Sequence, residues 1–104
     1  MAFERVAALE DLWDGEMRSL AIRGKKLLLV KLDGQVYAYE DRCAHLGLSL
    51  GDGRLENGVI TCKAHEYQYD ARTGLGINPK VARIRSYPVA LDGDFIAVDF
   101  SGER

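Results

Sequence analysis

The cysteines and histidines of this chain all fall in two short segments that share one order. Cys43 is followed by His45, and after sixteen further residues Cys62 is followed by His65; the other residues of the 104-residue chain include neither type. Thiolates and imidazoles are the ligands with which proteins bind zinc and iron. A fold that uses these residues together must bring the two segments side by side, so this pattern constrains the fold strongly.

Several kinds of site are compatible with this set of residues. A buried Cys or His is often only part of a packed core, but that explanation does not account for two matched segments. Two Cys and two His also form a common zinc site, although zinc fingers usually group their ligands by type. A nucleophilic Cys–His pair would leave the second segment without a role. The alternating order favours a [2Fe–2S] cluster of the Rieske type, in which two thiolates bind one iron and two imidazoles bind the other.

Length and composition indicate a small globular protein. We expect residues 1–104 to form one domain, because 104 residues can enclose their own core without disulfides. The net charge of −2 argues against a nucleic-acid-binding protein, which needs clustered Lys and Arg. The longest apolar run is too short to cross a membrane, and the first residues do not resemble a signal peptide. We therefore expect a cytoplasmic protein, where two Cys favour a metal or catalytic role over a disulfide.

Short strands separated by turn residues dominate the pattern. Residues 26–32 form an apolar run, residues 35–39 are rich in strand formers, and Asp33-Gly34 between them predicts a hairpin. Asn57-Gly58 and Asp92-Gly93 predict two more hairpins. A single helical turn is expected only near residues 8–13. This pattern predicts an all-β fold, a small antiparallel β-sandwich or barrel.

Both pairs of candidate ligands fall on loops of this predicted fold. Cys43 and His45 follow the strand that ends near Glu40, and Cys62 and His65 lie between two short strands. Loops at one end of a β scaffold can hold a cluster between them while the sheets supply rigidity. We expect residues 41–80 to form the cluster-binding part of the domain.

The segments around the ligands closely resemble the Rieske ferredoxins of bacterial multicomponent oxygenases. The resemblance covers about residues 3–100, nearly the whole chain. The segment 76–79 and the Met-x-Phe-Glu opening are most similar to the ferredoxins of toluene and alkene monooxygenase systems. Besides the four candidate ligands, the resemblance to the family rests on residues 48–53, 56–62, 67, 69, 72–74, 76–79 and 87–89.

The resemblance implies one [2Fe–2S] cluster per chain. Cys43 and Cys62 would hold the inner iron, and His45 and His65 the outer, more exposed iron. The segment around Pro79 would be the third loop that covers the cluster in this family, although Asn-Pro is also typical of an ordinary turn.

The chain departs from high-potential Rieske proteins at two features, and the second of them predicts a low reduction potential. Those proteins brace their loops with a disulfide, whereas the matching positions here are Leu48 and Ala64. They also place a Ser hydroxyl where this chain has Tyr67. One fewer hydrogen-bond donor favours the oxidised cluster, so we expect a potential toward the low end of about −150 to +300 mV.

The resemblance implies an electron carrier rather than an enzyme. The protein would accept single electrons from an NADH-dependent flavin reductase and deliver them to a terminal oxygenase. We expect this oxygenase to be a di-iron monooxygenase that acts on aromatic hydrocarbons or alkenes. We expect a monomer with no nucleic-acid or membrane partner. Three alternatives remain open: the ferredoxin of a Rieske aromatic-ring dioxygenase, the Rieske-like small subunit of a nitrite reductase, and a zinc-stabilised interaction module.

Overall fold

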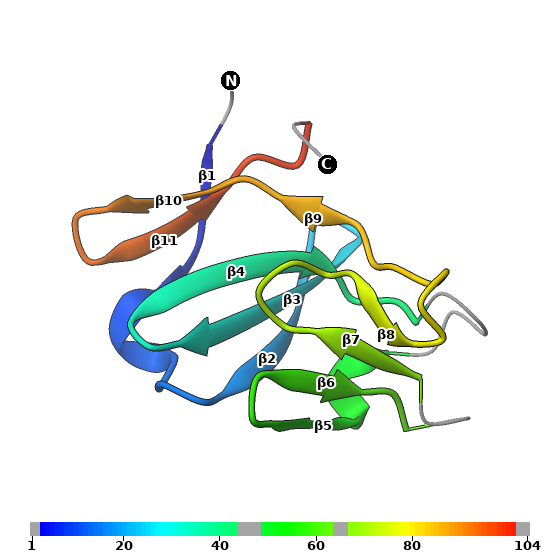
Figure 1. Ribbon diagram of the computed structural model, residues 1–104. Helices are drawn as coiled ribbons and strands as arrows, with labels where there is room; N and C mark the ends of the chain where they lie inside the picture. The colour runs from blue at the N-terminus through cyan, green and yellow to red at the C-terminus, as the bar shows by residue number, and fades with distance from the viewer. Residues whose placement is uncertain (1–2, 44–48, 64–66, 102–104) are drawn as a thin grey trace.

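The computed structural model describes residues 3–43, 49–63 and 67–101, and its strands form three antiparallel sheets (Figure 1). The predicted all-β class is confirmed. The sheet orders are β1-β11-β10, β2-β3-β4-β9 and β5-β6-β7-β8. The strands are β1 (Glu4–Ala8), β2 (Met17–Ile22), β3 (Lys25–Leu32), β4 (Gln35–Glu40), β5 (Arg54–Glu56), β6 (Val59–Thr61), β7 (Gln68–Asp70), β8 (Gly76–Asn78), β9 (Ser86–Tyr87), β10 (Val89–Asp92) and β11 (Phe95–Val98).

The sheet β2-β3-β4-β9 lies between two separate hydrophobic cores. Successive side chains of a strand point to opposite faces. Leu28 and Val30 of β3 therefore enter one core, and Leu27 and Leu29 enter the other. All four are fully buried. This burial on both faces explains why β3 is a continuous apolar run rather than an alternating one.

The two cores belong to different neighbours of this middle sheet. One contains Ile96 and Val98 of β11 and joins the middle sheet to β1-β11-β10. The other contains Ile60 of β6 and Tyr69 of β7 and joins it to β5-β6-β7-β8. Both cysteines lie in this second core. The outer sheet that carries Cys62 is thus packed directly against the sheet whose last residues lead to Cys43.

Two of the predicted hairpins form where the turn residues indicate. Asp33 and Gly34 join β3 to β4, and Asn57 and Gly58 join β5 to β6, with positive φ at all four residues. Positive φ at both central positions matches the twist of the flanking strands. The two Asx-Gly pairs therefore set the register of these hairpins.

The two remaining hairpins differ from the prediction, one in the position of its turn and the other because it was not predicted. The hairpin of β10 and β11 exists, but Asp92 pairs with Phe95, so the two central turn residues are Gly93 and Asp94. A further hairpin joins β2 to β3 through Arg23 and Gly24, both at positive φ. Arg is unusual at such a position, so this turn gave no clear signal in the sequence.

Helical structure within the described residues is limited to two 3-10 turns. The expected turn near residues 8–13 is η1 (Leu9–Asp11), which is shorter than predicted. The second, η2 (Leu50–Asp52), follows the first ligand segment and was not predicted. None of the helices in the described part of the chain has the length and apolar character needed to span a membrane.

Candidate metal centre

The two cysteines lie on loops, as predicted, and both are buried. Cys43 comes three residues after the end of β4, and Cys62 directly follows β6. Each is 1% exposed, and neither forms a disulfide. Both pack in the core that also contains Leu50 and Ile60. The fold therefore brings into one core two cysteines that are distant in the sequence and not joined by a disulfide.

The predicted histidine ligands lie outside the described residues. His45 belongs to the segment 44–48, and His65 belongs to the segment 64–66. Their role as ligands stays a prediction. The structure does locate the residues next to these segments, Cys43 and Ser49 for the first and Lys63 and Tyr67 for the second.

Tyr69 places a polar group against the first cysteine. Its Oη lies 3.5 Å from Cys43 Sγ, within hydrogen-bond distance of sulfur, and both side chains are buried. Tyr69 pairs with Ile60 across β6 and β7, and both side chains lie in the core that contains the two cysteines. If Cys43 is a thiolate ligand, the phenol must donate, because the sulfur has no proton. Tyr69 is one of the residues on which the family resemblance rests, but the sequence alone did not predict this contact.

The second ligand segment is closed by the backbone. Cys62 N donates to the carbonyl of Tyr67 at 2.8 Å, which joins the two ends of the loop. Gly53, just before β5, approaches this loop closely. A Cβ added at Gly53 would lie 1.9 Å from the Thr61 carbonyl oxygen and 3.2 Å from Lys63 N. Only glycine fits here without moving the backbone on either side of Cys62.

The loop around Pro79 begins beside the second ligand segment. Asn78, the last residue of β8, pairs with Gln68, the first residue of β7. The loop turns back at once, because Ala82 N donates to the Pro79 carbonyl and Gly76 N donates to the Ala82 carbonyl. The proline loop therefore leaves its strand at the end where the Cys62 loop enters β7. This placement agrees with the expected covering loop, whose role stays a prediction.

Charged side chains surround the ends of both ligand segments. Arg42, Lys63 and Lys80 are exposed and positive, whereas Asp52 is exposed and negative. Exposed charges of this kind change the rate at which partners meet more than the final affinity. The surface beside the buried thiols is thus charged although the site itself is apolar.

The described residues fit one half of a Rieske centre. Iron–sulfur clusters need deprotonated thiols that water and oxidants do not reach, and buried donors that compensate the charge on sulfur. Cys43 and Cys62 meet the first requirement through burial in one apolar core, and Tyr69 Oη meets the second at Cys43. Each thiol is also followed, within three residues, by one of the two histidines of the chain. The burial of the thiols and the hydrogen-bond donor at Cys43 are therefore both suited to an iron–sulfur cluster.

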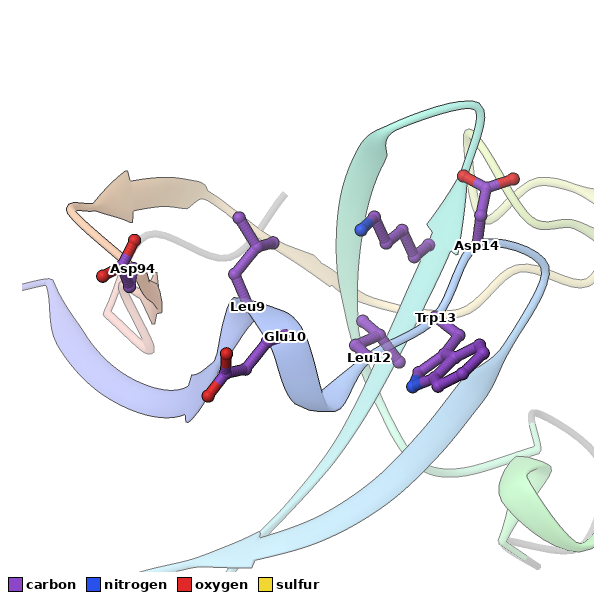
Figure 2. A pocket seen from close by; sticks show the side chains of 7 residues that line it. Leu9, Glu10, Leu12, Trp13, Asp14 and Asp94 are labelled. Carbon is purple, nitrogen blue, oxygen red and sulfur yellow. The ribbon is translucent and has the colours of Figure 1, made fainter.

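A separate hollow lies far from the cysteines. It has a volume of about 470 Å³ and is lined by residues around η1, including Leu9, Trp13 and Asp94 (Figure 2). In Figure 1, η1 lies on one side of the molecule, and β4 and β6 end on the other side. Neither of the two described cysteines lines the hollow. It is therefore distinct from the candidate metal centre.

Comparison with protein families and curated proteins agrees with these features. A family model described as "Rieske [2Fe-2S] domain" matches residues 2–88. The chain is 42% identical over 94 residues to the ferredoxin component of an alkene monooxygenase system from Xanthobacter autotrophicus, covering 89% of this chain and 77% of that protein. It is 32% identical over 95 residues to the ferredoxin component of a naphthalene 1,2-dioxygenase system from Pseudomonas aeruginosa, covering 90% and 91% of the two chains.

Solved structures show the same similarity. The ferredoxin of carbazole 1,9a-dioxygenase from Nocardioides aromaticivorans matches with a TM-score of 0.84 at 31% identity, covering 94% of this chain and 97% of that one. A ferredoxin-sized chain in a complex of reduced oxygenase and oxidised ferredoxin of carbazole 1,9a-dioxygenase also matches with a TM-score of 0.84, at 28% identity. The similarity extends over 92% of this chain and 91% of the matched one.

Proposed function

Since this chain belongs to the Rieske [2Fe–2S] domain family, we propose that it is the ferredoxin component of a multicomponent oxygenase system. It carries one Rieske-type cluster, which supplies one-electron redox chemistry. The protein is an electron carrier and not itself a catalytic enzyme. The observation that carries this proposal is the pair of buried cysteines, not joined by a disulfide, in one core. Over most of its length the chain is similar to ferredoxin components of oxygenase systems.

We assign the ligands by position. Cys43 and Cys62 hold the inner iron, because both thiols lie inside the apolar core. His45 and His65 hold the outer iron. Tyr69 donates a hydrogen bond to the Cys43 sulfur, and the side chains of Leu50 and Ile60 exclude water from the thiols. The whole chain forms one Rieske domain, with the cluster-binding part at residues 41–80.

The electron passes between two protein partners. A terminal oxygenase accepts it, as supported by the solved complex of a similar ferredoxin with its oxygenase. An NADH-dependent flavin reductase supplies the electron. The ferredoxin acts as a monomer, and both electron transfers take place in the cytoplasm. Redox encounters of this kind bury small areas and are short-lived. Exposed Arg42, Lys63 and Lys80 beside the ligand segments would then set the encounter rate.

The oxygenase partner is a monooxygenase of the alkene or aromatic hydrocarbon type. This finer assignment is supported by the higher identity to the alkene monooxygenase component, 42% against 32% for the naphthalene dioxygenase component. The second candidate is an aromatic-ring dioxygenase, which the solved carbazole dioxygenase ferredoxins favour.

Spectroscopy and electron transfer test the two levels of this proposal separately. The purified protein should be brown, contain iron and sulfide in equal amounts, and give a Rieske-type EPR signal after reduction. A colourless protein that binds zinc would overturn the proposal. The chemically reduced protein should then be reoxidised rapidly by an alkene monooxygenase hydroxylase and slowly by a naphthalene dioxygenase. The reverse order of rates would favour the second candidate.

A further inference from the structure

A buried carboxylate lies between the middle sheet and the first ligand segment. Asp41 follows the last residue of β4 and precedes Cys43 by two residues, and it is 3% exposed. A buried carboxylate is unfavourable unless hydrogen bonds compensate the loss of water. The hydrogen-bond partners of this carboxylate therefore indicate its structural role.

Both oxygens of Asp41 accept hydrogen bonds from residues on the far side of the first ligand segment. Ser49 Oγ donates to Oδ2 at 2.6 Å, and Gly51 N donates to Oδ1 at 3.0 Å. The backbone of Asp41 is fixed as well, because its N–H donates to the Lys26 carbonyl of β3 at 3.1 Å. One residue thus joins the two ends of the segment that carries Cys43 to the middle sheet.

The far end of this connection rests on β2. Ser49 Oγ lies 3.4 Å from Ser19 Oγ, and a Cβ added at Gly51 would lie only 1.7 Å from Ser19 Oγ. The neighbouring Leu50 is fully buried in the same core as the two thiols. The bonds to Asp41 therefore also hold η2 and Leu50 in place beside the cysteines.

We propose that Asp41 is a positioning residue for the first ligand segment. Its carboxylate holds the chain before Cys43 at a fixed distance from Ser49 and Gly51. The protein itself therefore positions Cys43 for the cluster, and cluster binding is not needed to position it. The chemistry explains why Asp is needed. A carboxylate accepts at both oxygens, whereas the isosteric Asn accepts at one and presents N–H groups to the other donor.

The inference rests on the proposed cluster site, and the chain offers a matched control for its test. Asp99 is also buried, at 2% exposed, and also accepts from one backbone N–H and one Ser hydroxyl, both of Ser101. It follows β11, on the sheet that contributes to the other core. Both Ser101 donors use the same oxygen, Oδ1, which an Asn amide oxygen can replace. Asp41→Asn therefore removes an acceptor beside the cysteines, whereas Asp99→Asn makes the same substitution at a buried site of the other core and keeps the acceptor.

The experiment measures cluster loss in the wild-type holoprotein, Asp41→Asn and Asp99→Asn. The probe is the decay of visible absorbance in the presence of an iron chelator, and urea midpoints of the three proteins are measured in parallel. We expect Asp41→Asn to lose the cluster about tenfold to a hundredfold faster than wild type, the factor expected from losing one hydrogen bond to a charged group. Asp99→Asn, which keeps its acceptor for Ser101, should lose the cluster at the wild-type rate. Equal cluster-loss rates in the two variants, or an unchanged rate in Asp41→Asn, would overturn the inference.

A milder variant keeps the test informative if Asp41→Asn does not fold. Ser49→Ala removes one of the two donors to Asp41 and should give a smaller acceleration of cluster loss. Amide exchange at Gly51 in the apoprotein gives a second reading, since it should become faster in Ser49→Ala and stay unchanged in Asp99→Asn. An unchanged Gly51 exchange rate in Ser49→Ala would contradict the inference. A wild-type protein that binds no cluster would overturn the proposed function instead, so the two failures are distinguishable.

Discussion

Individual polar groups have a large effect at Cys43 because the surroundings of its sulfur are apolar. The Tyr69 phenol reaches the sulfur from β7, a strand that enters the site from the other side of the core. Hydrogen bonds to cluster sulfurs stabilise the reduced state, which carries more negative charge. If Cys43 binds the cluster, the Tyr69 hydroxyl therefore contributes to the reduction potential.

Tyr69→Phe should lower the reduction potential. Loss of a hydrogen bond worth about 0.5–1.5 kcal/mol corresponds to a shift of about 20–60 mV for one electron. Protein-film voltammetry measures the shift. Tyr37→Phe is the control, because Tyr37 packs against the same core and, among the described residues, forms no hydrogen bond with either cysteine. A potential equal to that of wild type would mean that the phenol does not donate to the ligand sulfur.

The four candidate ligands could be found from the sequence because Cys and His are otherwise absent from the chain. The supporting residues could not. Tyr69 and Asp41 are common residue types, and their roles depend on strand register and on the return of the chain at Ser49. Such contacts join residues that are distant along the chain, so no local pattern marks them.

Short elements around the ligands are held by close backbone contacts. Gly53 has φ of −86°, a value that most residues adopt, so glycine is needed there for space rather than for its backbone freedom. The obstructing atom is the Thr61 carbonyl oxygen, which belongs to β6 and cannot rotate away. The contact therefore couples the start of β5 to the residue before Cys62.

Gly53→Ala should destabilise the fold and the cluster together. Overpacking of this kind costs about 1–3 kcal/mol, and relief of the clash must displace Thr61 and hence Cys62. Gly15→Ala is the control: nothing lies within 4 Å of its added Cβ, so only its positive φ opposes the change, at about 1 kcal/mol. Urea denaturation and the rate of cluster loss check both variants. Faster cluster loss in Gly15→Ala than in Gly53→Ala would contradict this account.

The sheets should survive removal of the cluster, whereas the loop that begins at Cys62 should lose its order. β3 and β4 are held by their own ladder and by two cores, whereas the Cys62 N–H bond to Tyr67 closes a loop that metal binding would stabilise. Hydrogen exchange of apoprotein and holoprotein should show unchanged protection at Leu28 and Leu29 and faster exchange at Cys62 in the apoprotein. Loss of protection at Leu28 and Leu29 would show that the scaffold depends on the cluster.

The residues at the turns predicted two of the hairpins from the sequence, and the elements that were not predicted have physical explanations as well. Asp33-Gly34 and Asn57-Gly58 mark their hairpins because both residues tolerate positive φ. Arg23-Gly24 forms a similar turn without that signal, because pairing of β2 with β3 imposes the conformation on Arg23. η2 was not predicted because it depends on Asp41 and on the burial of Leu50.

Across the whole molecule, Tyr39 links the middle sheet to the sheet that carries Cys62. It lies on β4, and its hydroxyl donates to the Ala71 carbonyl, just beyond β7, at 2.7 Å. Both residues are buried. Burial raises the pKa of the Tyr39 phenol well above its ordinary value of 10, and the negative charge of Asp70 and then Tyr37 raise it further. The phenol must stay protonated to donate this hydrogen bond between the two sheets.

The fold should lose stability in alkali for this reason. Because the pKa of Tyr39 is raised on folding, the unfolded chain releases the proton first. The contribution to stability is complete below pH ~10 and falls by about 1.4 kcal/mol per pH unit above it, until the folded-state pKa is reached. Urea denaturation at increasing pH, compared with Tyr39→Phe, measures the slope. The variant should be less stable at neutral pH and should show a shallower alkaline decline, and equal slopes would exclude Tyr39 as the cause.

Electron uptake by the whole protein should depend on pH in a separate way. If His45 and His65 bind iron, each has a second ring nitrogen that can lose a proton, more easily when the iron is oxidised. Reduction then raises those pKa values, so protons favour the reduced state. The potential should be flat at neutral pH and fall by about 59 mV per pH unit for each coupled proton once pH exceeds the oxidised-state pKa. Voltammetry combined with tyrosinate absorbance separates this fall from unfolding, because the ligand protons leave without ionising Tyr39. A potential that stays constant, or that falls only as tyrosinate appears, would exclude exposed histidine ligands on the redox-active iron.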